Sequence, residues 1–181
     1  MRAISTAYEL GSNEKEYARI AAQLAERGMD VYSGYGVGAI VVMNYYDQED
    51  GNELHEKHNT YIYGGFNINV SGMQNKVHAE QLALFQAMVD MEMSGMFKRA
   101  ELEKVIVVTH EHDNSLVCGH CMQVFRGISE HYGWDTREID YISAAYTEEE
   151  EKPKNFHNSG WEFERHKLNE LMGDTYVSNR E

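Results

Sequence analysis

Hydrophobic side chains in the first part of the chain recur at the spacing of a helix. Between Asn13 and Gly28, apolar positions follow one another every three or four residues, at Tyr17, Ile20, Ala21 and Leu24. This spacing predicts an amphipathic helix with one buried face. Asn13 can cap its start, with Glu16 as the capping-box partner, and Gly28 can end it.

Four later segments have the pattern of strands. Residues 37–46 and 60–66 flank a polar turn and predict a hairpin. Residues 104–109, Lys-Val-Ile-Val-Val-Thr, form a short, almost continuous apolar run, which is typical of a strand buried on both faces. Residues 139–145 predict a fourth strand.

Further helices are predicted between these strands and after them. One covers about 77–91, a second begins near Cys118 and stops before Gly133, and a last one covers 165–172. The resulting order is helix, strand, strand, helix, strand, helix, strand and a tail. It predicts an α/β fold with a mixed sheet and helices packed against it, formed by residues 1–181 as a single domain.

Composition narrows the classes of protein and partner. The chain has 181 residues, 42% of them hydrophobic, so it can enclose a core of its own. No apolar run reaches the length of a membrane span, and Glu9 and Glu14 come too early for a secretory signal, so we expect a cytoplasmic protein. The 16 basic residues are scattered among 30 acidic ones, giving a net charge of −14. That charge disfavours stable binding to nucleic acid and favours a small uncharged substrate.

Cys118 and Cys121 are the two cysteines of the chain, and they form one C-x-x-C motif. Two thiols in one motif exclude a framework of several disulfides. The motif is therefore either a redox pair or half of a metal site.

A histidine supplies the other half of such a metal site. His78-Ala79-Glu80 opens one predicted helix, and the C-x-x-C motif opens the next. Because a helix start favours thiolate over thiol, and because a buried strand links the two helices, one imidazole and two thiolates can meet at one end of the sheet. Three protein ligands plus water are typical of a catalytic zinc, and one neutral histidine with two thiolates balances its charge. Glu80, two residues after His78, is placed to take a proton from the water.

The spacing H-x-E followed by C-x-x-C is the signature of zinc-dependent nucleobase deaminases. Other segments resemble the cytidine deaminase family. Residues 32–39, Tyr-Ser-Gly-Tyr-Gly-Val-Gly-Ala, are similar to its Y-S-x-F-x-V-G-A segment, and residues 65–69, Gly-Phe-Asn-Ile-Asn, to its G-x-N-x-E segment. Residues 167–172 resemble its closing L-x-E-L-L, so the similarity extends over nearly the whole chain.

This resemblance implies a three-layer fold with helices on both faces of a mixed sheet. It implies one Zn²⁺ per chain, bound by His78, Cys118 and Cys121, with Glu80 as the proton shuttle. The implied reaction, part of pyrimidine salvage, is hydrolytic deamination of cytidine or deoxycytidine to the uridine form with release of ammonia. In this implied reaction the activated water attacks C4 of the cytosine ring, and Glu80 protonates N3 of the ring and then the leaving amine. No organic cofactor is implied. The implied partners are a small-molecule nucleoside substrate and further copies of the chain in a homo-oligomer, for which a tetramer is favoured over a dimer. The implied substrate-binding residues are Tyr35, Asn67, Asn69 and Ala79.

Several positions depart from the family pattern. Asn69 stands where the family has a glutamate, which leaves open a different cytosine-containing nucleoside, such as a blasticidin-like aminonucleoside. Val117 replaces a proline, Met122 an arginine, and Gln81 the arginine that some members carry after the catalytic glutamate. Residues 91–103 are expected to be an insertion in a helix or loop, and residues 148–153 a solvated acidic loop.

Two further alternatives to this function remain at the level of the sequence, together with the question of a second metal site. A deaminase of cytosine or adenine within nucleic acid would share the motifs, although the acidic charge disfavours it. A zinc-stabilised scaffold without turnover would share the ligands but would have no use for Glu80. A second metal site could use the remaining histidines, although loop positions are the simpler interpretation of His55, His58, His110 and His112.

Overall fold

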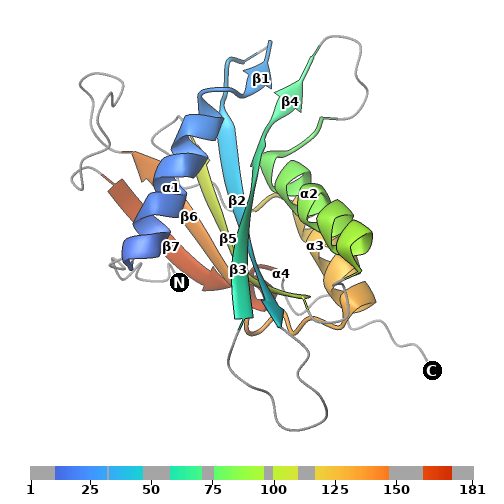
Figure 1. Ribbon diagram of the computed structural model, residues 1–181. Helices are drawn as coiled ribbons and strands as arrows, with labels where there is room; N and C mark the ends of the chain where they lie inside the picture. Colours follow the sequence, from blue (N-terminus) through green and yellow to red (C-terminus); the bar gives the residue numbers. More distant parts are fainter. Residues whose placement is uncertain are drawn as a thin grey trace, which may run out of the picture.

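The computed structural model describes residues 11–31, 33–46, 58–70, 76–95, 100–109, 117–146 and 161–172. Its helices and strands alternate along the chain (Figure 1). In chain order they are α1 (Ser12–Ala25), β1 (Met29–Asp30), β2 (Val37–Tyr46), β3 (His58–Phe66), β4 (Ile68–Asn69), α2 (Ala79–Ser94), β5 (Ala100–Thr109), α3 (Gly119–Tyr132), β6 (Asp140–Tyr146), β7 (Trp161–Lys167) and α4 (Leu168–Met172).

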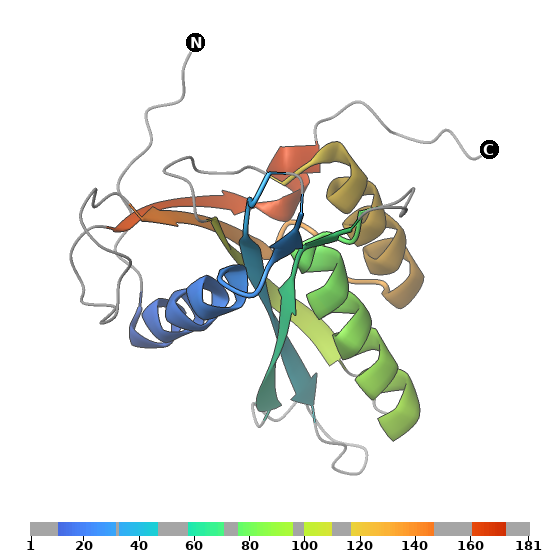
Figure 2. The same cartoon turned by 90° about the horizontal axis from the view of Figure 1, so that it is seen from above.

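Five strands form one mixed sheet in the order β3-β2-β5-β6-β7. β2 runs antiparallel to β3 and β5, β5 runs parallel to β6, and β7 closes the sheet antiparallel to β6. Helix α1 covers one face, while α2, α3 and α4 cover the other (Figure 2). The predicted three-layer α/β fold with helices on both faces is therefore confirmed.

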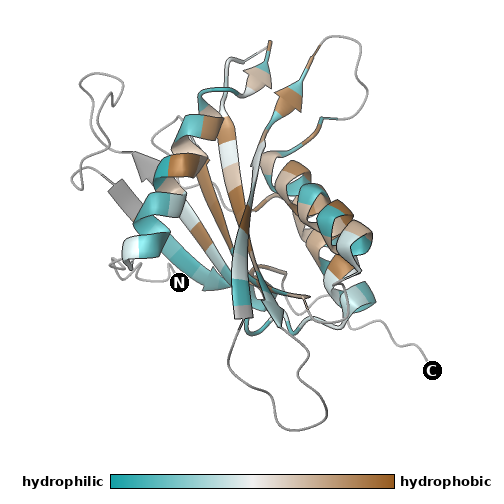
Figure 3. Ribbon diagram, in the orientation of Figure 1, coloured by the Kyte–Doolittle hydropathy of each residue, from teal (hydrophilic) through white to brown (hydrophobic). Residues whose placement is uncertain are grey.

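The central strands are apolar because both of their faces are covered. Val41 of β2 and Ile106 of β5 are completely buried, and the residues beside them on both strands are almost as inaccessible. Figure 3 shows these strands as the brown interior between helices whose outer faces are partly teal. Burial on both faces explains why 104–109 has a continuous apolar run in place of alternation.

Helix α1 begins differently from the prediction. Its first residue is Ser12, and the N–H of Gly11 donates a 3.0 Å hydrogen bond to the carboxylate of Glu14. Asn13 therefore lies inside the helix, and Glu16 pairs with Arg19. The predicted Asn13 cap is wrong because an acidic side chain one turn into the helix satisfies the free backbone N–H instead.

The helix predicted over 165–172 is also partly wrong. Residues up to Lys167 continue β7, where Arg165 pairs in register with Ile142 of β6, and the helix is only Leu168–Met172. Pairing with β6 overrides the local helical tendency of this charged segment. The predicted stop at Gly173 lies outside the described residues.

The segment 91–103 lengthens two regular elements and is not simply an added loop. α2 continues to Ser94 and ends at Gly95, whose φ of 71° lies in the left-handed region. β5 begins at Ala100, which pairs with Tyr45. Residues 96–99 lie outside the description, as do the predicted acidic loop at 148–153 and His55, His110 and His112.

Two short strands were not predicted. β1 and β4 pair in parallel, with Met29 opposite Ile68 and Asp30 opposite Asn69. In Figure 1 this pair lies beyond the ends of the main sheet, next to the start of α2. Among the helices of the described residues, none combines the length and the hydropathy that a membrane crossing requires.

Candidate active site

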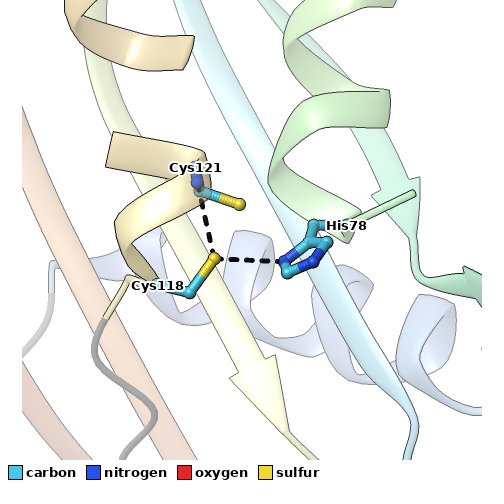
Figure 4. Close-up of side chains that lie close together, drawn as sticks. All are labelled: His78, Cys118 and Cys121. Carbon is cyan, nitrogen blue, oxygen red and sulfur yellow. Dashed lines mark hydrogen bonds between the residues drawn. The ribbon is translucent and has the colours of Figure 1, made fainter. Parts of the chain in front are cut away.

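The N-terminal ends of α2 and α3 lie side by side on one face of the sheet. His78 is the residue that precedes α2, Cys118 precedes α3, and Cys121 lies in the first turn of α3. The Nδ1 atom of His78 is 3.3 Å from the Sγ atom of Cys118, and the ligand atoms of all three residues lie within 4.8 Å of one another (Figure 4). The structure thus brings together the three residues that the sequence pairs as metal ligands.

This arrangement fits a zinc ion. In a tetrahedral site with Zn–S near 2.3 Å and Zn–N near 2.1 Å, neighbouring ligand atoms are about 3.6–3.8 Å apart. The separations in the His78, Cys118 and Cys121 group bracket this value. Both cysteines are free thiols, so the donor set of one imidazole and two sulfurs is complete for a three-ligand site. His78, Cys118 and Cys121 would hold the ion.

Hydrogen bonds at the two helix starts fix these ligands. The side-chain oxygen of Gln81 accepts from the N–H of His78 at 3.2 Å. Across the site, the N–H of Cys121 donates to the Sγ atom of Cys118 at 3.4 Å. This backbone donor at the start of α3 holds the Sγ atom of Cys118 in place. Gln81 thus holds His78 in position at the start of α2.

Glu80 lies beside the ligands and is only 6% exposed. Burial raises the pKa of its carboxyl, although a backbone hydrogen bond and the charge of His78 act in the opposite direction. A carboxyl with a raised pKa is more easily protonated, which suits a group that both accepts and donates protons. Burial, together with the nearby negative charges of Glu80 and Cys118, also raises the pKa of the Cys121 thiol. A divalent cation would reverse that balance by coordinating the thiolate.

A cavity of about 240 Å³ opens onto this group. His78, Glu80 and Cys118 form part of its wall. The four residues that the sequence predicts to bind substrate also line it: Tyr35, Asn67, Asn69 and Ala79. Ala79 is completely buried at the start of α2, so it contributes shape but little exposed surface.

The side chain of Asn67 is largely engaged by the protein itself. Its Oδ1 atom accepts from the N–H of Val37 at 2.8 Å, and its Nδ2 atom donates to the carbonyl of Tyr35 at 2.8 Å. Asn67 therefore ties the segment before β2 to the end of β3. Tyr35 in turn is held at the pocket wall by its backbone.

Two charged residues of the pocket were missed by sequence reasoning. Asp30 and Lys76 both line the cavity, and the Nδ2 atom of Asn69 donates to the Oδ1 atom of Asp30 at 3.0 Å. Nothing in the local pattern marks Asp30, because its place in the pocket depends on the β1–β4 pair, which is too short to predict. The one hint in the sequence is that Asp30 is a polar residue just before the segment 32–39.

No protein-family model and no curated protein sequence matches the chain. Solved structures do match. The cytidine deaminase of Burkholderia pseudomallei superposes with a TM-score of 0.58 at 17% identity, over 92% of this chain and 100% of that one. The cytidine deaminase of Mycobacterium tuberculosis gives a TM-score of 0.51 at 19% identity, over 93% and 98%. The chain therefore has the fold of cytidine deaminases.

Proposed function

We propose that this protein is a zinc-dependent hydrolase that deaminates cytidine and deoxycytidine to uridine and deoxyuridine, as part of pyrimidine salvage. The observation that carries the proposal is the convergence of His78, Cys118 and Cys121 beside a nucleoside-sized pocket. His78, Cys118 and the buried Glu80 form part of the wall of this pocket. A purely structural zinc has no need of an open pocket or of such a carboxyl.

The ligand set is suited to activating water. One neutral imidazole and two thiolates carry a total charge of −2, which balances a divalent ion and leaves a formally neutral centre. When bound there, zinc would supply water activation, since it lowers the pKa of a water ligand from 15.7 to about 7. A third thiolate would oppose that ionisation. His78 in place of a third cysteine therefore favours catalysis.

Glu80 moves the protons of the reaction. It accepts a proton from the attacking water and delivers it to N3 of the cytosine ring as the new C4–O bond forms. It then passes the second proton of that water to the amino group on C4, the C4–N bond breaks, and ammonia leaves the uracil product. Burial keeps bulk water away from these transfers and raises the pKa of the carboxyl.

One specific feature favours a second candidate substrate. Asn69 replaces a family glutamate, while the carboxylate of Asp30 lies against it in the pocket. A carboxylate also attracts an amine, so a cytosine-containing aminonucleoside of the blasticidin type is the alternative. A polynucleotide substrate is disfavoured by the net charge of −14.

We further propose that the chain is one catalytic domain that works as a homo-oligomer, with a tetramer ahead of a dimer. Phe85, Val89 and Met93 of α2 are spaced four residues apart and are 45%, 57% and 84% exposed. Such a stripe on one helix face is typical of an interaction surface. A cytoplasmic location would keep the two cysteines reduced, as metal ligands require. Size-exclusion chromatography with light scattering tests the oligomeric state.

A panel of nucleosides tests the activity. Zinc-loaded protein is mixed with cytidine, deoxycytidine, blasticidin S and adenosine, and deamination is followed by ultraviolet absorbance and by ammonia release. Metal analysis of the same preparation measures zinc per chain. We expect turnover of both natural cytosine nucleosides with about one zinc per chain. Slow turnover of both, with rapid turnover of blasticidin, would favour the alternative, and no turnover with bound zinc would favour a scaffold.

A further inference from the structure

The pocket wall has two sources of polar groups. His78, Glu80 and Cys118 come from the starts of α2 and α3, whereas Asp30 and Asn69 come from the β1–β4 pair (Figure 1). If the reacting base lies against the first group, the rest of the substrate meets the second. The chemistry of Asp30 and Asn69 therefore selects among substrates by the substituent that is attached to the base.

The carboxylate of Asp30 is held in a fixed orientation. Its Oδ1 atom accepts from the amide of Asn69 at 3.0 Å and from the N–H of Ser33 at 3.1 Å. Asn69 is only 6% exposed, so its amide acts from the protein side of the pair, while Asp30 is partly exposed and lines the cavity. An acceptor that is already oriented loses little freedom when a ligand binds.

A carboxylate accepts hydrogen bonds and donates none. Its bonds to hydroxyl groups are charge-assisted and about twice as strong as those of a neutral amide. It also repels a phosphate. Among the described residues, the exposed Lys76 is the basic side chain that lines the same cavity. One exposed lysine beside a carboxylate leaves little net attraction for a phosphate dianion.

We propose that Asp30 determines substrate specificity by accepting hydrogen bonds from the sugar hydroxyls of a free nucleoside, with Asn69 as the residue that positions it. This inference deepens the proposed function and rests on it. It assigns to Asp30 a role that sequence comparison would look for at position 69. The substrate class is then a hydroxylated nucleoside without a 5′-phosphate.

The test compares hydroxylated and dideoxy ligands in Asp30→Asn, which keeps the size of the side chain and removes its charge. Cytidine and 2′,3′-dideoxycytidine are the substrates, and uridine and 2′,3′-dideoxyuridine are the ligands for calorimetric binding. We expect Asp30→Asn to weaken cytidine kcat/KM and uridine affinity by about tenfold or more, and to change the dideoxy values less than about threefold. Asn69→Ala should act in the same direction with a smaller factor.

The matched control is Asp135→Asn, which removes one exposed carboxylate that pairs with Arg137. It should leave all four values unchanged. Equal losses for hydroxylated and dideoxy ligands in Asp30→Asn, no loss at all, or a loss confined to an aminonucleoside would overturn the inference while leaving deamination intact. If wild-type protein binds uridine with the expected dependence on Asp30 but does not turn over cytidine, the proposed function fails, while Asp30 is upheld as the acceptor of the sugar hydroxyls. Tighter binding of cytidine monophosphate than of cytidine would also overturn it.

Discussion

The Oδ1 atom of Asn67 accepts a 2.8 Å hydrogen bond from the N–H of Val37, the first residue of β2. Through its Nδ2 atom the same side chain donates to the carbonyl of Tyr35. The side-chain amide of Asn67 thus makes hydrogen bonds to two backbone groups of the segment that places Tyr35 at the pocket. This relationship makes Asn67 a structural residue as well as a candidate contact to the sugar.

Replacing Asn67 should therefore lower stability as well as activity. We expect Asn67→Ala to reduce the free energy of unfolding by about 1–3 kcal/mol, because it leaves two partly buried backbone groups without partners. Urea unfolding followed by circular dichroism measures this loss. Asn13→Ala is the control: because Asn13 is an exposed residue inside α1 and not its cap, the substitution should change little. A loss for Asn13→Ala as large as for Asn67→Ala would contradict both assignments.

Gly65 allows β3 to approach the start of α2. A Cβ atom at this position would lie 2.2 Å from the carbonyl oxygen of Ala79, and because that contact is with backbone, α2 would have to move. His78 and Glu80 flank Ala79, so we expect Gly65→Ala to weaken zinc binding and to destabilise the fold by about 1–3 kcal/mol. Competition with a zinc chelator measures the affinity.

The neighbouring Gly64 provides the matched control for this substitution. A Cβ atom there would meet the end of the flexible Leu24 side chain at 2.7 Å. That side chain can rotate away, so Gly64→Ala should leave zinc affinity near that of the wild type. Equal zinc affinity in the two variants would show that the contact of β3 with α2 does not position the ligands.

Tyr141 has a completely buried hydroxyl that makes no hydrogen bond of ordinary geometry within the described part of the chain. Burial, with the negative charges of Glu80, Cys121 and Cys118, raises its pKa. Tyr141→Phe removes only that hydroxyl. We expect the free energy of unfolding to stay unchanged or to rise by about 1 kcal/mol, with zinc content unaltered. A loss of more than 1 kcal/mol would show that the hydroxyl is bonded in solution, with Glu80 as the nearest candidate.

Glu14 joins α1 to the sheet, since its carboxylate contacts Lys104 and Arg165. Burial alone would raise its pKa, but the hydrogen bonds from Lys104 and Gly11 and the two positive charges outweigh burial and lower it below the ordinary 4.5. A lowered pKa in the folded state means that the stabilisation is present above pH 4.5 and is lost as pH falls through the lowered value.

The comparison of wild type with Glu14→Gln measures this contribution. We expect the wild type to be more stable by about 1–3 kcal/mol at pH 7, and the two curves of unfolding free energy against pH should converge as pH falls below 4.5. Glu16→Gln, which changes an exposed carboxylate on the same helix, should show little difference at any pH. A gap between wild type and Glu14→Gln that widens toward low pH would contradict the sign of the shift.

The parts of the fold that the sequence predicted well are those with a strong local pattern. The bounds of β2 agree with 37–46, and α3 stops before Gly133 as expected. The β1–β4 pair has two residues per strand, too few for any periodicity to appear. Arg165 was assigned to a helix because its pairing with β6 is a tertiary contact that local propensity does not report.

In the candidate site, too, the residues with a local sequence pattern were predicted, and a residue that depends on tertiary contacts was missed. His78, Cys118 and Cys121 were expected to meet because each lies at the start of a helix, and the structure brings them together. Their role as zinc ligands, and that of Glu80 as proton shuttle, stay predictions. Asp30 was missed because its partner Asn69 is 39 positions away and reaches it only through the fold.

The most direct test of the account compares wild type with Glu80→Gln, both loaded with zinc, in an assay of ammonia release from cytidine and in metal analysis of the same samples. Glutamine keeps the size of the buried side chain but does not shuttle protons. We predict about one zinc per chain in both proteins, an unchanged circular dichroism spectrum, and a loss of turnover of about a hundredfold or more in the variant. Zinc retained with undiminished ammonia release in Glu80→Gln would contradict the mechanism.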